Sequence, residues 1–285
     1  MSETDGRKID SMRRVKYIYV LTIGILIYGC EAEIPARNVP YKLDIDIYPS
    51  YSGESLSPVI IFIHGGAWTG GDKDHWGPKQ IEVFRGIGFT SISINYPTAY
   101  RHPAHIQSIA KTLKWIQDSI HRHGGNARKI VLAGHSAGAH LAALAAINQK
   151  YLANERFDVT NIRLVCSIDA GSYMTLDNGR PDDSYAEAYY RAAGFSNNGS
   201  WWDFTPANHI VPGKKIPPMY LIYSNDPYRI ASNESFASRL KKGNVEVKCH
   251  EVTSTTSHND MLYEFPVYSF ADSSIIQTIV SYTLN

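Results

Sequence analysis

Apolar residues fall into two kinds of segment, which alternate from about residue 43 towards the C-terminus. One kind is a short run rich in Val, Ile and Leu, typical of a buried β-strand, and the other has the spacing of an amphipathic helix. This alternation predicts an α/β fold, with a mostly parallel sheet and helices on both faces. The predicted strands are Leu43–Tyr48, Val59–Ile63, Thr90–Asn95, Lys129–Ala133, Leu164–Ile168, Pro218–Ser224 and Val245–Val252, and the predicted helices are Pro78–Arg85, Pro103–His123, Ala139–Ile147 and Asn233–Lys242.

The longest predicted helix has one apolar stripe, which should face the sheet. The stripe consists of Ile106, Ile109, Leu113, Ile116 and Ile120.

A long polar and aromatic segment, residues 171–212, interrupts the alternation. Segments of this length within a compact domain are usually functional, so we interpret it as a small cap over Ser136. A surface excursion with ordinary packing aromatics is the alternative. The aromatic residues are Tyr173, Tyr185, Tyr189, Tyr190, Trp201 and Trp202.

An uncharged run, Tyr17–Cys30, lies near the N-terminus and follows Arg13, Arg14 and Lys16. It is short for a transmembrane helix and has the proportions of the apolar core of a secretory signal. Its end, Gly29-Cys30, resembles a lipobox, in which the cysteine is lipidated after cleavage, although Tyr28 departs from that pattern. We therefore expect residues 1–30 to be a leader and the protein to be exported, as a lipoprotein anchored through Cys30 or as a secreted protein. A short anchor helix and a start at Met12 remain open.

Composition fits one soluble domain, residues 31–285, behind that leader. The chain has 285 residues, of which 44% are hydrophobic, enough for a large core. The net charge of +1 and the absence of a basic stripe give no reason to expect nucleic acid as a partner.

Ser136 is the strongest candidate for a reactive residue. The predicted strand Lys129–Ala133 runs into Gly134-His135-Ser136-Ala137-Gly138, and a helical stretch follows at once. This is a G-x-S-x-G motif in the strand–turn–helix context that exposes a nucleophilic serine, and glycines at both ends leave room where a Cβ would clash. The start of the following helix directs N–H groups to where negative charge would develop.

A second glycine motif provides candidate oxyanion donors. The predicted strand Val59–Ile63 leads into His64-Gly65-Gly66-Ala67-Trp68, where paired glycines let backbone amides approach a substrate oxygen closely. We assign the oxyanion hole to the amides of Gly65, Gly66 and Ala137. Metal ligands with zinc-type spacing are absent from the sequence, and this chemistry requires no metal or organic cofactor.

An acid and a base are expected beyond the later strands, at the sheet edge where α/β proteins bind ligands. Asp226 follows the predicted strand Pro218–Ser224, and His258 lies in a polar loop after Val245–Val252. We predict that Asp226 orients His258. The alternative acids are Asp169, which ends the preceding strand, Asp203 and Asp260.

The remaining histidines are weaker candidates for the base. His64 and His135 belong to the two motifs, and we expect His64 to brace the oxyanion loop and His135, with Trp68, to contact substrate. His250 lies within a strand. Positions on a solvated helix face are expected for His102, His105, His121 and His123.

Together these motifs resemble the α/β-hydrolase esterase/lipase family that shares His-Gly-Gly and Gly-x-Ser-Ala-Gly, close to carboxylesterases and kynurenine-formamidase-like enzymes. The order Ser136, Asp226, His258 is also similar to the order in that family. The resemblance covers about residue 41 to the C-terminus; Ser257-His258-Asn259-Asp260 departs from the family's usual glycine-rich surround of the base. Further matching segments are Asn95-Tyr96-Pro97, His102-Pro103-Ala104, Thr205–Ile210 and Asp226-Pro227 with Ile230.

The resemblance implies a serine hydrolase that forms an acyl-enzyme. We expect short-acyl or aryl carboxylic esters as substrates, with an N-formyl arylamide as the alternative and an inactive exported binding protein on the same fold as a second one. In the family's sheet, the strands that contain Cys166 and Cys249 are separated by another strand. A disulfide between them is therefore not expected, and both are interpreted as buried free thiols.

Overall fold

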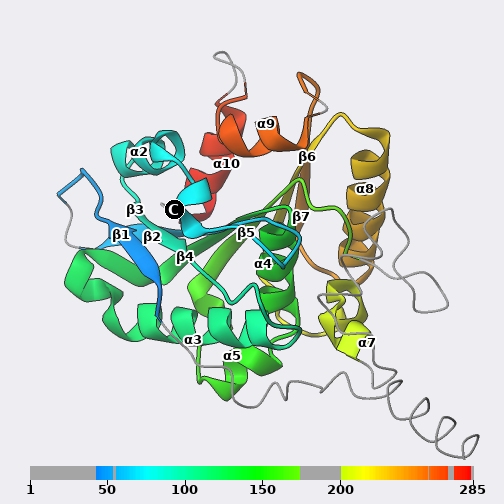
Figure 1. Ribbon diagram of the computed structural model, residues 1–285, viewed down its shortest axis with the longest axis horizontal. Helices are drawn as coiled ribbons and strands as arrows, with labels where there is room; N and C mark the ends of the chain where they lie inside the picture. Colours follow the sequence, from blue (N-terminus) through cyan, green and yellow to red (C-terminus); the bar gives the residue numbers. More distant parts are fainter. Residues whose placement is uncertain (1–42, 54–55, 174–199, 256, 269–272, 284–285) are drawn as a thin grey trace, which may run out of the picture. The chain divides into compact units, whose positions relative to one another are not determined.

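The computed structural model describes residues 43–53, 56–173, 200–255, 257–268 and 273–283, which all belong to one compact unit, Val39–Asn285. One seven-stranded sheet runs through it in the order β1-β3-β2-β4-β5-β6-β7 (Figure 1). Only the edge strand β1 is antiparallel to its neighbour, and all other neighbours are parallel. The predicted α/β fold with a mostly parallel sheet is confirmed.

The strands coincide closely with the apolar runs of the sequence. In β2 every side chain is buried, because Ile61 and Ile63 face one core while Ile60 and Phe62 face the other. Two-sided burial explains why these strands are continuous apolar runs. The strands are β1 (Ile45–Tyr48), β2 (Ser57–Ile63), β3 (Thr90–Ile94), β4 (Gly125–His135), β5 (Ile162–Ile168), β6 (Met219–Ser224) and β7 (Val247–Val252).

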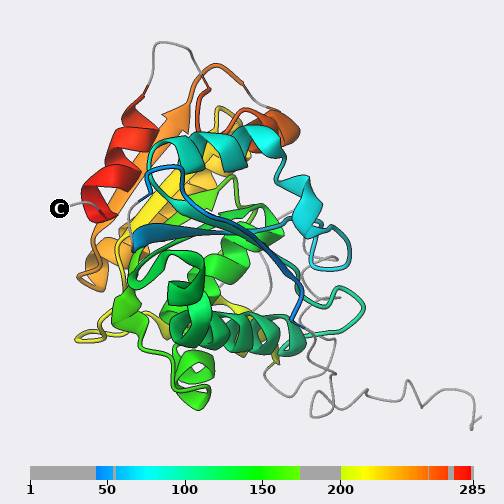
Figure 2. The ribbon, with the colours of Figure 1, turned by 90° about the vertical axis from the view of Figure 1, so that its left-hand side faces the viewer.

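Helices cover both faces of the sheet (Figures 1 and 2). On one face lie α3 (Ala104–Ser119), α4 (Ala137–Ile147) and α8 (Pro227–Lys242), and the stripe Ile106 to Ile120 is buried there as expected. The other face packs against α2 (Pro78–Gly86), α9 (His258–Tyr263) and α10 (Ser274–Thr283). The shorter elements are α5 (Lys150–Asn154), α7 (Ser200–Phe204) and the 3-10 turns Lys73–His75, Ile120–His123, Val159–Asn161 and Pro206–His209.

Two predicted helices have different bounds in the structure. The α-helical part of Pro103–His123 ends at Ser119, and its last turn tightens into a 3-10 turn. The helix predicted to begin at Asn233 begins at Pro227, because the Asp226 side chain accepts a hydrogen bond from the Arg229 amide and caps it.

The strand register brings four loops to one edge of the sheet. Ile63 of β2 lies opposite Gly134 of β4, and His135 lies opposite Ile168 of β5. Ile168 in turn lies opposite Ile222 of β6. The residues that follow these strands therefore gather at the carboxyl edge, where parallel sheets bind ligands.

Several expectations fall on other parts of the chain. The leader, with Cys30, and residues 174–199 of the expected cap lie outside the described residues. Within the described ranges, no helix combines the length and apolarity needed to cross a membrane. Cys166 and Cys249 are both free, with β6 between their strands, but Cys249 is exposed, so the expectation of two buried thiols was wrong for that residue.

Candidate active site

Ser136 occupies the sharp turn between β4 and α4. Its backbone has φ 56° and ψ −121°, a region that a non-glycine residue enters only at an energetic cost of about 1–3 kcal/mol. The Ser136 amide donates a hydrogen bond to the Ile168 carbonyl at 2.9 Å, which ties the turn to β5. This is the strained elbow that the motif predicts, with the serine at the start of a helix.

The glycines of the elbow are required by close backbone packing. A Cβ on Gly134 would lie 2.2 Å from the carbonyl oxygen of Gly138. A Cβ on Gly138 would lie 2.2 Å from the carbonyl oxygen of Ile63, the last residue of β2. The elbow thus sits directly against the strand that leads into the second glycine motif.

His258 is paired with Asp169. Its Nδ1 lies 2.6 Å from Oδ2 of Asp169, whose side chain is fully buried, while the His258 side chain is 33% exposed. His258 is the first residue of α9, and the side chain of Ser257 caps that helix by accepting from the Asp260 amide. Part of the imidazole therefore remains accessible while the buried carboxylate fixes its orientation.

Asp169 is held on all sides. Its Oδ1 accepts hydrogen bonds from the amide and the hydroxyl of Ser224, both at 2.9 Å, and Arg229 donates from Nη1 to its backbone carbonyl at 2.8 Å. Burial raises the pKa of Asp169, but the hydrogen bond from His258, the Arg229 charge and the Ser224 amide outweigh it and lower the pKa below its usual value. Asp169 is therefore ionised at neutral pH. Neither Ser224 nor Arg229 stands out in the sequence.

The predicted pairing of Asp226 with His258 differs from the structure. Asp226 caps α8, with Oδ1 accepting from the Arg229 amide at 3.0 Å, so its carboxylate is engaged at the helix start. Asp169, at the end of the preceding strand, takes the place beside His258. The remaining two candidate acids lie elsewhere: Asp260 accepts from the Thr255 hydroxyl, and Asp203 belongs to a separate cluster.

His135 contacts His258 from the side of the elbow. Its buried Nε2 lies 2.9 Å from the His258 carbonyl, and the two rings are 4.4 Å apart between centroids. Burial, followed by the His258 charge, lowers the pKa of His135 to about 3, so its ring is neutral and donates from Nε2. We expected His135 to contact substrate, but its Nε2 contacts the His258 carbonyl instead.

His135, Asp169 and His258 also have ligand-type atoms within 4.8 Å of one another. Asp169 already holds Nδ1 of His258, and the backbone carbonyl of His258 already accepts from Nε2 of His135. The hydrogen bonds suit an oriented imidazole better than a metal centre.

The loop after β2 lies against the elbow. A Cβ on Gly65 would be 3.1 Å from the Ser136 Cβ, so the two motifs are in direct contact. The loop carbonyls are used by neighbours: Tyr96 donates its hydroxyl to the carbonyls of His64 and Gly65, and the amides of Thr69 and Gly70 donate to Gly66. Among the described residues, no hydrogen bond has the Gly65 or Gly66 amide as its donor. Both amides therefore remain candidate oxyanion donors.

The same loop has an unusual backbone, with φ 108° at Gly66, 50° at Ala67 and 61° at Trp68. On one side the buried His64 ring stacks on Tyr96 at 4.2 Å between centroids. On the other side Trp68 is 6% exposed and its ring packs against His140 and Phe204, so it lies inside the protein.

Two further histidines differ from expectation. His102 and His105 were expected on a solvated helix face, but they are 7% and 0% exposed. They contact Asp203 and the Trp68 carbonyl respectively.

Comparison with known proteins agrees with this architecture. The chain matches the BD-FAE family over residues 45–230. It is 37% identical over 108 residues to the Mycobacterium tuberculosis protein "Esterase LipQ", a match that covers 37% of this chain and 26% of that protein. The chain thus spans about a quarter of the length of the first curated relatives that it matches.

Solved structures share the fold over most of the chain. An acetyl ester-xyloside bifunctional hydrolase from Caldicellulosiruptor lactoaceticus has a TM-score of 0.65 at 20% identity, covering 85% of this chain and 89% of its own. Esterase B from Lactobacillus rhamnosis has a TM-score of 0.66 at 17% identity, covering 95% and 94%. The chain has the α/β-hydrolase fold and belongs to the BD-FAE family.

Proposed function

We propose that this protein is a serine hydrolase of carboxylic esters, with Ser136 as nucleophile, His258 as base and Asp169 as orienting acid. The observation that carries the proposal is the contact of His258 with a buried, ionised Asp169. His258 also packs against His135, the residue that precedes the serine of the strained elbow. The esterase names of relatives and structural neighbours support the same reaction class.

Each of these residues has one role in the proposed reaction. His258 Nε2 takes the Ser136 hydroxyl proton as Oγ attacks the ester carbonyl, and the amides of Gly65, Gly66 and Ala137 stabilise the resulting oxyanion. Collapse breaks the ester C–O bond while His258 protonates the departing alcohol. Water, deprotonated by His258, then hydrolyses the acyl-enzyme, which releases the acid and restores Ser136.

Asp169 contributes by orientation and charge. Its Oδ2 accepts the Nδ1 proton of His258, which leaves Nε2 as the basic atom, and its negative charge stabilises the imidazolium that forms in each half-reaction. Ser224 and Arg229 keep the carboxylate in that position.

The preferred acyl group is proposed to be short. The loop beside Ser136 is held by the Tyr96 hydroxyl and by the packed Trp68 ring, which we expect to restrict the space for a long acyl chain. The structurally similar acetyl ester-xyloside bifunctional hydrolase from Caldicellulosiruptor lactoaceticus supports acetyl as one such group.

A substrate panel tests this proposal. p-Nitrophenyl acetate, butyrate, octanoate and decanoate are compared with an N-formyl arylamide. We expect kcat/KM to be highest for acetate or butyrate. A kcat/KM that rises steadily with chain length would identify a lipase, and a preference for the formamide would replace the ester proposal.

The place of action is proposed from the sequence alone. If residues 1–30 are a lipoprotein leader, expression in a bacterial host should yield a membrane-bound protein that incorporates labelled palmitate, since acyl chains anchor at about 0.8 kcal/mol per buried CH₂. Cys30→Ser should abolish incorporation. An intact mass showing unmodified Cys30 would contradict the lipid anchor and leave the hydrolase proposal unaffected.

A further inference from the structure

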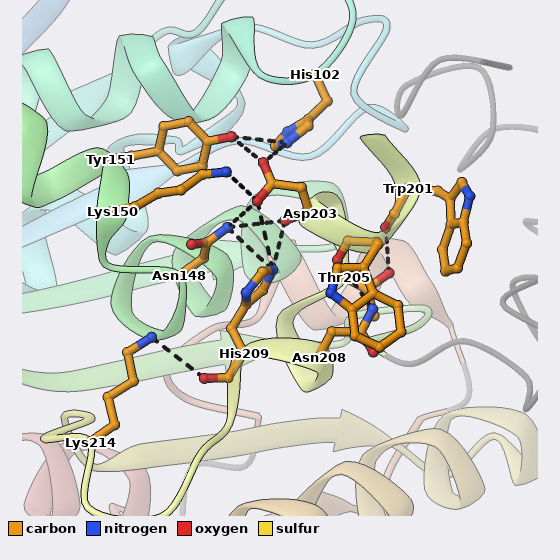
Figure 3. Close-up of polar contacts among 11 residues, drawn as sticks. His102, Asn148, Lys150, Tyr151, Trp201, Asp203, Thr205, Asn208, His209 and Lys214 are labelled. Carbon is orange, nitrogen blue, oxygen red and sulfur yellow. Dashed lines mark hydrogen bonds and ion pairs between the residues drawn. The ribbon is translucent and has the colours of Figure 1, made fainter. Parts of the chain in front are cut away.

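A second polar cluster surrounds Asp203 in α7, apart from the His258–Asp169 pair (Figure 3). The Asp203 carboxylate contacts side chains from the loop before α3 and from the segment in which α4 ends and α5 begins. It therefore connects α7 to both of these segments. The contacts are His102 Nε2 at 2.8 Å, Lys150 Nζ at 2.5 Å, Asn148 Nδ2 at 2.9 Å and the Tyr151 hydroxyl.

The cluster holds Asp203 as an anion. Burial raises the pKa of its carboxyl, but the hydrogen bonds from His102, Lys150, Tyr151 and Asn148 outweigh it and bring the pKa far below its usual value. The His102 side chain is 2% exposed and the Asp203 side chain 21% exposed, so this contact is largely shielded from water. Charge-assisted hydrogen bonds of this kind fix position more strongly than neutral ones.

Phe204, the next residue, is thereby fixed in the interior. Its ring is fully buried and lies 5.0 Å from His102 and 4.5 Å from His140, between centroids. It also lies 5.5 Å from the Trp68 ring in an edge-on arrangement. Phe204 therefore connects the Asp203 cluster to the loop beside Ser136.

Trp68 ends the run of positive φ in that loop. Bulky residues reach this backbone region only where packing enforces it. The enforcing contacts on Trp68 are the Phe204 ring, the His140 ring at 5.2 Å and His105, whose Nε2 lies 3.2 Å from the Trp68 carbonyl. Gly65 and Gly66 directly precede Ala67 and Trp68, the two non-glycine residues of the loop with positive φ.

We propose that Asp203 is a positioning residue for the reaction: it fixes Phe204 against Trp68 and so holds the Gly65–Gly66 amides in the geometry that binds the oxyanion. This inference rests on the proposed role of those amides. Loss of Asp203 should relax the loop and lower transition-state stabilisation, while ground-state binding of the ester, which does not yet carry the charge, changes little.

The kinetic split distinguishes positioning from other roles. A residue that only stabilises the fold would lower the unfolding temperature without changing kcat below the transition. A residue that contacts bound ester would raise KM. Displacement of the oxyanion donors lowers kcat at constant KM. It also weakens the binding of a trifluoromethyl ketone by a similar factor, because this inhibitor binds serine hydrolases as a tetrahedral oxyanion.

The test compares Asp203→Asn and Phe204→Leu with the wild type on p-nitrophenyl acetate. Asp118→Asn is the matched control, because it removes a carboxylate from an exposed pair with Lys114. We expect kcat to fall about 10- to 100-fold in both variants, KM to stay within twofold, and the trifluoromethyl ketone Ki to rise in parallel, with Asp118→Asn unchanged. Phe204→Leu keeps the Asp203 contacts and carries the same expectation if Asp203→Asn does not fold.

Wild-type kcat with a lowered unfolding temperature, or a rise in KM alone, would overturn the inference. Its failure is distinct from failure of the proposed function. If wild-type protein reacts at Ser136 with a phosphonate and the variants retain wild-type kcat, only the inference fails. If wild-type protein neither reacts nor hydrolyses esters, the proposed function itself fails.

Discussion

Asp169 illustrates how much of this site depends on single contacts. Its two carboxylate oxygens have separate partners, Ser224 on one and His258 on the other, and its backbone is held by Arg229. Asp226 lies at the end of the next strand, yet its carboxylate serves α8. The two acids therefore offer a matched comparison.

Asp169→Asn should lower kcat on p-nitrophenyl acetate by roughly three to four orders of magnitude, because an amide NH₂ opposite Nδ1 favours the wrong imidazole tautomer. Asp226→Asn should leave kcat within about twofold, since Asn caps helices as well as Asp does. Steady-state kinetics of both variants, with far-UV circular dichroism to verify folding, measures this difference. The reverse ranking would return the acid to Asp226.

At this scale the motif residues were predictable and the acid was not. Ser136, Gly65 and Gly66 stand in short motifs whose backbone demands are local. Both Asp169 and Asp226 follow a buried strand, so strand position alone does not separate them. The sequence Asp226-Pro227 is typical of a helix start, with an acidic cap followed by proline, and this is the signal that could have favoured Asp169.

At the scale of elements, the sheet and its helices follow from apolar patterning, and junctions decide the details. The apolar stripe Ile106 to Ile120 correctly predicted the position of α3. The predicted start of α8 was wrong, because its first turn lacks apolar spacing and depends on the Asp226 cap. The junction between β4 and α4 is tightly packed, since a Cβ on Gly138 would meet the end of β2.

Gly138→Ala should destabilise the protein by about 1–3 kcal/mol and lower kcat/KM, because its Cβ would press on the Ile63 and His64 carbonyls and displace the elbow. Gly86→Ala is the control: it ends α2, and nothing lies within 4 Å of the added Cβ. That variant should be neutral or more stable by up to about 1 kcal/mol. Urea unfolding midpoints compare the two; equal stability would contradict the packing account.

At the scale of the whole molecule, buried neutral histidines link stability to pH. Burial lowers the pKa of six imidazoles and brings three of them, His105, His135 and His140, to about 3. The other three are His64, His102 and His209. The sequence could not reveal this, because burial of His102 and His105 depends on residues 203 and 204, a hundred positions away.

Stability should therefore fall as the pH drops below about 6.5, where the unfolded chain takes up protons that the folded protein does not bind. Each buried imidazole contributes at most about 1.4 kcal/mol per pH unit between that value and its own folded pKa. The urea midpoint, measured at pH 7, 6 and 5, should decrease at each step. His105→Gln, which retains a donor for the Trp68 carbonyl, should reduce the slope. A midpoint that is constant from pH 7 to 5 would contradict neutral burial.

The most direct test of the hydrolase account is covalent labelling of the wild-type protein with a fluorophosphonate, followed by intact and peptide mass spectrometry. We predict a single adduct on Ser136, no adduct in Ser136→Ala, and slow labelling in Asp169→Asn, because His258 is then poorly oriented to take the Ser136 proton. Absence of an adduct from the folded wild-type protein, or an adduct on another residue, would contradict the assignment of Ser136 as the nucleophile.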